Sequence, residues 1–165
     1  MKALVAGIGN IFFGDDGYGS EVARALDREV MPADVRVADF GIRGMHVAFE
    51  MLDGYDLVLL VDAVSRGGAP GTLYAIEPEN DPFSTAPADA HAMDLQSVLV
   101  MYERLSDDLK PAKLPKIVII GCEPESTREG IGLSDAVAAA VPSSLALIYD
   151  ILVRDGIGDR NYEKA

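Results

Sequence analysis

The chain has 165 residues, of which 49% are hydrophobic and 25% charged, and its formal net charge is −13. This length fits one domain over residues 1–165 and can bury a hydrophobic core. The acidic excess opposes binding to nucleic acid or to anionic membrane surfaces, because both present negatively charged phosphates. No uninterrupted apolar stretch reaches the roughly 18 residues that a membrane span needs.

Cys122 is the only cysteine, which excludes an internal disulfide and any site built from several thiolates. A single cysteine is compatible with a reducing cytoplasm. The N-terminus begins with an apolar run that is too short for the core of a signal peptide. It is typical of a buried strand instead.

The first half of the chain alternates strand and helix signals. Apolar runs predict strands over 2–7, 35–40 and 57–61, and the last of these is apolar throughout, as in a central strand covered on both faces. Helical spacing predicts a helix from 17 to about 28 and a short one over 44–52, where Met45, Phe49 and Leu52 share one side.

The second half continues the alternation. A weaker strand over 72–76 is followed by a long loop over 77–90 and by a helix from 94 to about 105. A strand over 116–120 and a last helix from Ser134 to about 153 complete the order, with Ser134 as the N-cap. Pro142 should kink this helix or mark a restart.

This order of elements predicts the α/β class, as a three-layer α/β/α sandwich around a mainly parallel sheet. In such sheets ligands bind at the carboxyl ends of the strands. Asp16 and Asp62 follow predicted strands, and His91 ends the long loop, so all three can meet at one edge. Two carboxylates and one imidazole suit Ni²⁺, Zn²⁺, Mn²⁺ or Fe²⁺, and three protein ligands leave positions open for substrate.

Structural roles compete with this metal site. An aspartate after a buried strand is often a turn residue or a helix cap, and a carboxylate is stabilised at a helix N-terminus. His46, the only other histidine, is expected to be a solvent-facing or hydrogen-bonded helix residue rather than a ligand. Cys122, after an apolar run, is expected to be a small packed thiol.

The glycine-rich segment after the first strand also allows a nucleotide-binding interpretation. It matches the first two glycines of the dinucleotide fingerprint, but Phe12 stands in place of the third. Asp15 and Asp16 would repel a pyrophosphate, and the chain has no phosphate-binding GxxxxGK[ST] loop. The GxSxG and HExxH motifs of other hydrolases are absent from the sequence as well.

Several short motifs are spread over almost the whole chain: Gly7-x-Gly9-Asn10, Gly14-Asp-Asp-Gly17-x-Gly19, Leu-Leu-Val-Asp62-Ala, His91, Gly121-Cys-Glu-Pro124 and Gly132-Leu-Ser134. In combination and in this order they resemble the hydrogenase maturation proteases, which trim the large-subunit precursor of [NiFe] hydrogenases. Each motif is weak alone, and the combination is specific. The resemblance implies a five-stranded α/β/α sandwich and action in the cytoplasm.

The resemblance also implies a substrate and a set of site residues. The substrate is the immature large subunit, cut at its C-terminal extension after nickel insertion. The metal-contacting positions of the family fall on Asp16, Asp62 and His91, so nickel arrives with the substrate and no organic cofactor is expected. Asp39 and Gly41 match a family loop written Asp-x-Gly-Thr, in which Ile42 replaces the threonine. Asp39 is a candidate general base and a further catalytic residue.

Three other functions remain open from the sequence. The chain could be a non-catalytic nickel-binding or assembly protein on the same fold, a Rossmann-like nucleotide-binding domain, or a protease for another metalloprotein precursor. The lead hypothesis is a nickel-dependent maturation endopeptidase whose partner is a hydrogenase large-subunit precursor.

Overall fold

The computed structural model describes residues 1–78 and 90–158, and within 90–94 it describes the backbone alone. A single five-stranded sheet runs through it in the order β2-β1-β3-β5-β4. The strands are β1 (Ala3–Ile8), β2 (Val35–Gly41), β3 (Leu57–Ala63), β4 (Leu73–Ile76) and β5 (Lys116–Cys122). Strands β2, β1, β3 and β5 are parallel, and β4 pairs with β5 in the antiparallel direction at one edge.

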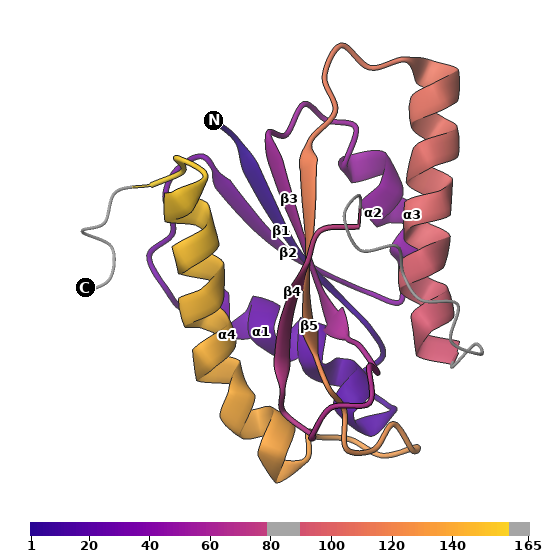
Figure 1. Ribbon diagram of the computed structural model, residues 1–165, viewed down its shortest axis with the longest axis vertical. Helices are drawn as coiled ribbons and strands as arrows, with labels where there is room; N and C mark the ends of the chain where they lie inside the picture. The colour runs from indigo at the N-terminus through magenta and orange to yellow at the C-terminus, as the bar shows by residue number, and fades with distance from the viewer. Residues whose placement is uncertain (79–89, 159–165) are drawn as a thin grey trace.

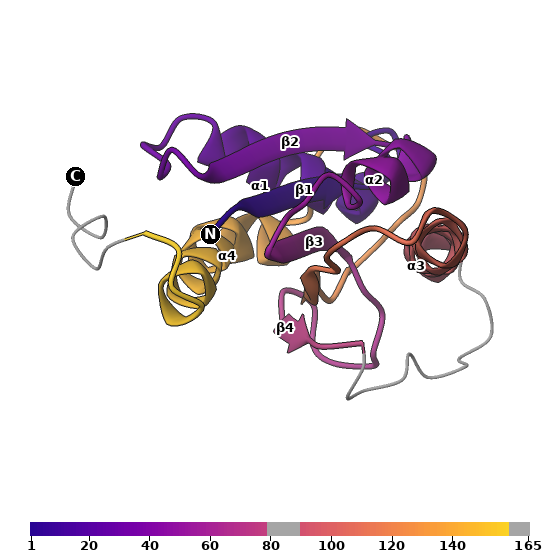
Figure 2. The same ribbon diagram turned by 90° about the horizontal axis from the view of Figure 1, so that it is seen from above.

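Helices cover both faces of this sheet. They are η1 (Gly14–Gly17, a 3-10 helix), α1 (Tyr18–Leu26), α2 (Gly44–Glu50), α3 (Ala90–Leu109) and α4 (Asp135–Arg154). In Figure 1, α1 and α4 lie to the left of the sheet and α2 and α3 to its right, and the view from above in Figure 2 shows the same three layers. The predicted mainly parallel α/β/α sandwich is therefore confirmed.

Two hydrophobic clusters fill the space on either side of the sheet, because alternate residues of each strand point to opposite faces. On β3, Leu57, Leu59 and Val61 belong to the cluster under α1 and α4, and Val58 and Leu60 belong to the cluster under α2 and α3. All seven residues of β3 are buried, as the apolar run over 57–61 predicts for a central strand.

Close contact between α1 and the sheet depends on Gly19. A methyl group at this position would fall 2.2 Å from Val61 O and 2.3 Å from Ile8 O, which is far inside van der Waals contact. Gly19 thus allows the close helix–strand packing that the third glycine supplies in the dinucleotide fingerprint. Phe12, which replaces that third glycine, is largely exposed and takes no part in the packing.

Three sequence predictions need correction. Met45 and Phe49 of α2 are exposed, and the buried face of this helix is Val47 and Ala48. Helix α3 begins at Ala90, so His91 stands in its first turn and not in a loop before it. Asp62 lies inside β3, one residue before its end, because pairing with β5 continues to Ala63.

Pro142 lies inside α4, which continues on both sides of it. Of the two outcomes expected at Pro142, a restart does not occur, and a kink stays a prediction.

The long loop predicted over 77–90 falls mostly on 79–89, outside the described residues. Helix α4 is the only described helix that is long and apolar enough to cross a membrane, by length and composition alone. Its inner face packs on the sheet, where Val137, Ile148 and Leu152 are fully buried. These apolar side chains of α4 therefore belong to the hydrophobic core of the protein.

Candidate functional site

Asp16 and Asp62 converge at the carboxyl end of the parallel strands. Asp16 is 2% exposed and Asp62 is 1% exposed. Helix η1, which carries Asp16, packs against β3, which carries Asp62. A methyl group at Gly9 would lie 3.3 Å from Asp62 Oδ1 and 1.9 Å from Asp16 O, so the turn after β1 fits between the two residues. Asp62 Oδ1 thus lies beside Gly9, and the Asp16 carboxylate reaches the next residue, Asn10, from whose backbone N–H it accepts a hydrogen bond.

Backbone donors fix both carboxylates. Asp16 Oδ2 accepts a hydrogen bond of 2.9 Å from Asn10 N, and Asp62 Oδ1 accepts one of 2.8 Å from Ala63 N. Burial in a medium of low polarity is costly for a charge unless a cation or hydrogen bonds compensate it. A site of this kind favours a bound cation. It opposes a phosphate group, which argues against the nucleotide-binding alternative.

The third predicted ligand, His91, lies in the first turn of α3, and its side chain is outside the described residues. Among the side chains that the structure describes, no group of three His, Cys, Asp or Glu is arranged to hold a metal ion. His46 is exposed on α2, as expected for a histidine without a ligand role. The three-residue metal site therefore remains a prediction, and of its three proposed members the structure describes the side chains of Asp16 and Asp62.

Asp39, the predicted general base, lies near the end of β2, close to the same edge of the sheet. Its Oδ1 accepts a 2.8 Å hydrogen bond from Ser20 Oγ of α1 and a 3.0 Å bond from Gly41 N. Within the described part of the chain, Asp39 Oδ2 accepts no hydrogen bond. The carboxylate is thus held in one orientation with one oxygen left for a substrate or a water molecule. Gly41 adopts φ +54°, a conformation that glycine permits and other residues rarely adopt.

Asp15, beside Asp16, has a structural role that reasoning from the sequence did not find. It is fully buried, and it accepts hydrogen bonds from Glu125 N at 2.8 Å, Ser126 N at 3.1 Å, Ser134 N at 2.7 Å and Ser134 Oγ at 2.9 Å. These bonds fasten the loop between β5 and α4 to the segment that carries Asp16. The family motif Gly-Leu-Ser134 was the available signal, because Ser134 is both the partner of Asp15 and the N-cap of α4.

Glu123 directly follows β5 and binds the segments next to β5 at this edge of the sheet. Its carboxylate accepts hydrogen bonds from Arg66 N at 2.8 Å, Gly67 N at 3.2 Å and Tyr74 Oη at 2.8 Å. Glu123 therefore ties the loop after β3 and strand β4 to β5. Like Asp15, it is a buried carboxylate whose hydrogen-bond capacity is used by the fold.

Cys122 is not an activated nucleophile. Burial, and then the nearby charges of Asp15 and Glu123, raise the pKa of its thiol to about 12. Only the thiolate is reactive, so the thiol is inert at neutral pH. This confirms the expectation of a small packed thiol, fully buried in the core.

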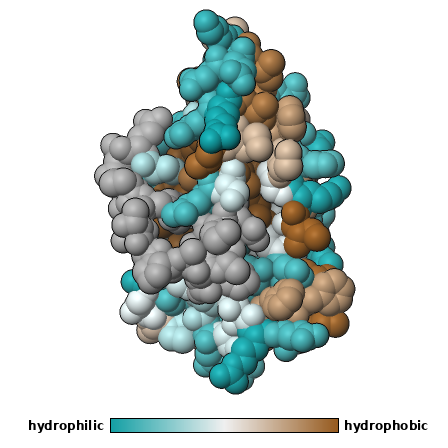
Figure 3. All heavy atoms as spheres, turned by 90° about the vertical axis from the view of Figure 1, so that its right-hand side faces the viewer, coloured by the Kyte–Doolittle hydropathy of each residue, from teal (hydrophilic) through white to brown (hydrophobic). Residues whose placement is uncertain are grey.

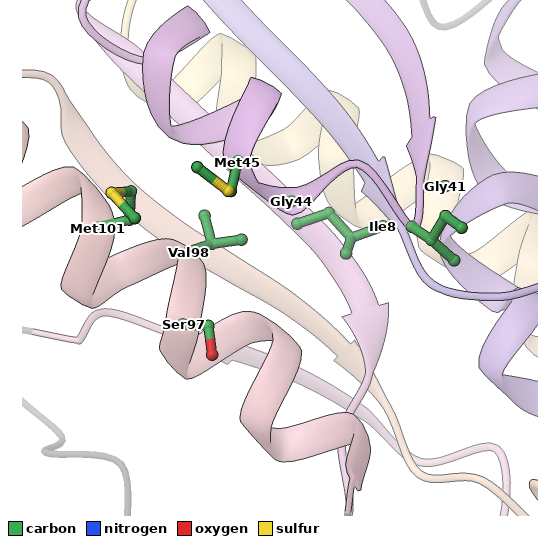
Figure 4. A pocket seen from close by; sticks show the side chains of 8 residues that line it. Ile8, Gly41, Gly44, Met45, Ser97, Val98 and Met101 are labelled. Carbon is green, nitrogen blue, oxygen red and sulfur yellow. The ribbon is translucent and has the colours of Figure 1, made fainter.

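Two neighbouring hollows open beside Asp39. The smaller, of about 290 Å³, is lined by Ile8, Gly41, Ile42, Gly44, Met45, Ser97, Val98 and Met101. Figure 4 shows Met45 of α2 facing Val98 and Met101 of α3 across it. The larger, about 860 Å³ and open to solvent, runs between β2 and α2 and includes Asp39 in its wall. Ile42, Gly44 and Met45 line both hollows, so the two adjoin.

Comparisons with known proteins agree with this architecture. The profile of the family HycI, hydrogenase maturation protease, matches residues 20–151. The hydrogenase 2 maturation protease of Escherichia coli is 30% identical over 159 residues, which cover 95% of this chain and 94% of the relative. A putative hydrogenase maturation protease of Methanocaldococcus jannaschii is 33% identical, over 88% of this chain and 92% of the relative.

Solved structures extend the likeness to three dimensions. The hydrogenase maturating endopeptidase HybD from E. coli superposes with a TM-score of 0.76 at 28% identity, covering 94% of both chains. The maturation protease HybD from Thermococcus kodakarensis gives a TM-score of 0.72 at 25% identity, covering 92% of this chain and 99% of the other. Fold, sequence and motif order thus define one class of protein. The chain belongs to the hydrogenase maturation protease family.

Proposed function

We propose that this protein is an endopeptidase that removes the C-terminal extension of a [NiFe]-hydrogenase large-subunit precursor after nickel has been inserted. The observation that carries the proposal is the convergence of Asp16 and Asp62, both buried, at the carboxyl edge of the sheet in a member of this family. The endopeptidase activity follows from the family, and the dependence on nickel, which the family resemblance implies, is part of the proposal. We expect this processing to occur in the cytoplasm.

In this proposal the nickel ion belongs to the substrate. Asp16, Asp62 and His91 contact the nickel that the precursor already holds, and two carboxylates with an imidazole are a suitable donor set for that ion. Recognition then selects nickel-loaded precursors, because a nickel-free precursor offers no cation for the buried carboxylates to contact. The metal contributes position and positive charge at the cut.

Asp39 is the proposed general base. A base must reach the proton it removes directly or through one water molecule. Oδ2 of Asp39 is the accepting atom, since Oδ1 is occupied by Ser20 Oγ and Gly41 N. Oδ2 would take the proton of a water molecule as that water attacks the scissile carbonyl carbon, and the amide nitrogen of the released tail would be protonated when the C–N bond breaks.

The test compares nickel-loaded and nickel-free forms of one precursor. The protein is incubated with each form, and intact mass reports any loss of the C-terminal segment. We expect the loaded precursor alone to shorten. Cleavage of both forms at equal rates would reject nickel recognition and keep the peptidase. Binding without cleavage of either form would favour the non-catalytic assembly protein.

A further inference from the structure

Strand β2 leaves one side open. It is an edge strand of the sheet and pairs with β1 alone within the described part of the chain. In a parallel ladder the peptide groups of successive residues point alternately to the two sides. The carbonyl oxygen of Asp34 accepts a hydrogen bond from Ala3 N, so it faces β1. By alternation, the peptide groups of Arg36 and Ala38, two and four residues later, face β1 as well. The peptide groups of Val37 and Asp39 therefore face the open side.

These outward groups form a regular array. Val37 N–H, Val37 C=O and Asp39 N–H lie along about 7 Å of strand, the length of two residues. Asp39 C=O accepts a 3.1 Å hydrogen bond from Arg43 Nη2, so a side chain of the protein itself already uses that group. A second extended chain offers donors and acceptors at the same spacing, which is how peptides bind to sheet edges in many proteins.

The walls of the larger hollow suit such a chain. It follows β2 along Arg36, Ala38, Asp39 and Phe40, and its other wall is α2. Ile42, Met45 and Phe49 line it and are exposed by 74%, 58% and 54%. Figure 3 shows the side of the molecule where α2 and α3 lie, with apolar atoms reaching the surface among polar ones. Apolar side chains of a bound segment would cover these three residues.

We infer that an extended segment of the substrate protein, next to its cleavage point, pairs with β2 as an added sixth strand. This inference rests on the proposed endopeptidase function. Continuity with the site selects this occupant over a second copy of the chain, because the open edge ends at Asp39, the proposed base, which also lines the larger hollow. Pairing with Val37 and Asp39 would hold the scissile peptide extended and in a fixed register beside the proposed base.

A substitution at Val37 separates pairing from folding. Val37→Pro removes the outward N–H and leaves the bonds to β1, since proline is tolerated on an edge strand where its nitrogen faces solvent. Val37→Ala is the matched control, because it removes the same side-chain contacts and keeps the N–H. We expect Val37→Pro to lower kcat/KM for nickel-loaded precursor about tenfold, as for the loss of one hydrogen bond in a strand pairing. Val37→Ala keeps the N–H, so any loss it shows measures side-chain packing, and it should lose clearly less kcat/KM than Val37→Pro.

A second measurement does not depend on the folding of the proline variant. Asp39→Asn keeps an oxygen for Ser20 and Gly41 and is expected to bind precursor without cutting it. Amide hydrogen exchange of this variant, with and without nickel-loaded precursor, measures directly how well the amides at the edge of β2 are protected. We expect the backbone amides at positions 37 and 39 to become protected in the complex.

The outcomes are distinguishable. If the wild type cleaves the precursor while Val37→Pro is unimpaired and the edge amides stay unprotected, strand pairing is wrong and the proposed function stands. If the wild type neither binds nor cleaves the precursor, both proposals fail. Edge protection that depends on protein concentration in the absence of precursor, with a dimeric mass in solution, would assign the edge to a second copy and overturn the inference.

Discussion

Ser20 Oγ donates a 2.8 Å hydrogen bond to Asp39 Oδ1, which joins the buried side of α1 to the end of the edge strand β2. Ser20 is 1% exposed, so water does not replace this donor readily. Together with Gly41 N it occupies one oxygen of the carboxylate and leaves the other for chemistry. The orientation of the proposed base thus depends on a helix from a different part of the chain.

Ser20→Ala should reduce cleavage of nickel-loaded precursor by about tenfold in kcat, since a misoriented base loses part of the 10²–10⁴-fold effect typical of general base catalysis. The cost to the free energy of unfolding should be about 1–2 kcal/mol, as for a lost buried hydrogen bond. Ser144→Ala is the control. Ser144 is equally buried and bonds Tyr18 Oη at 2.6 Å, away from Asp39, so it should lose stability and keep kcat. Equal kcat losses in both variants would refute a positioning role.

Asp15→Asn should destabilise the protein by about 2–4 kcal/mol, because the amide group of asparagine would meet backbone donors and leave buried polar groups unsatisfied. Asp15 accepts from three backbone N–H groups and one hydroxyl, all in the segment 125–134. Urea denaturation measures the change. Asp107→Asn, on the exposed side of α3, should change stability by less than about 0.5 kcal/mol. A small effect at Asp15 would mean that the loop relaxes around the new side chain.

Local patterns in the sequence were enough to predict most of the fold. Apolar runs located four of the strands, and the predicted N-cap, Ser134, accepts from Val137 N in the structure. The errors arose where tertiary contacts outweigh local spacing. The apolar residues Met45 and Phe49 suggested one face of α2, but contact with α3 and the sheet buries Val47 and Ala48. Helix capping alone could not fix the start of α3.

The candidate site shows the same limit. The positions of Asp16 and Asp62 near the strand ends follow from the topology of parallel sheets, which brings those ends to one edge. The motif Gly-Leu-Ser134 marked Ser134, but no local pattern could pair it with Asp15, because the two residues are 119 apart in sequence. The contact of Ser20 with Asp39 likewise requires α1 to lie against β2, which no local pattern specifies.

Cys122→Ala should leave cleavage activity unchanged, because the thiol is buried and protonated at neutral pH. The raised pKa also predicts a pH effect. The folded thiol titrates near 12, and the unfolded thiol near 9.0, so the unfolded state loses its proton first and wild-type stability falls as the pH rises above 9. The alanine variant has no thiol, so its stability does not fall for this reason. At pH 10 the stability difference between the two proteins should shift by about 1 kcal/mol from its value at pH 8.

Denaturation curves of both proteins at the two pH values measure this shift, and the tyrosines that also titrate are common to both. A thiol-alkylating reagent gives an independent reading, since native Cys122 should stay unmodified at pH 8. Rapid alkylation of the native protein, or loss of cleavage in the alanine variant, would return Cys122 to the list of candidate nucleophiles.

His91→Ala should abolish nickel-dependent removal of the precursor's tail and leave the fold intact. His91 stands in the first turn of α3, where truncation of a helix-end residue usually changes stability by about 0.5 kcal/mol or less. Asp16 and Asp62 alone would leave the substrate's nickel with two protein ligands. Docking of the precursor should therefore weaken by more than about tenfold, since loss of a ligand or of its supporting residue costs 10–100-fold in comparable metal sites.

His46→Ala is the matched control, because it removes an imidazole from the exposed surface of α2, to which we assign no metal contact. The two variants are compared by thermal unfolding, by mass analysis of nickel-loaded precursor, and by pull-down of uncleaved precursor. We expect His46→Ala to cleave as the wild type does, and His91→Ala to fold, bind poorly and not cleave. Full cleavage by both variants would contradict the nickel contact proposed for His91. Inactivity of His46→Ala alone would assign the nickel contact to His46, which lines the larger hollow between β2 and α2.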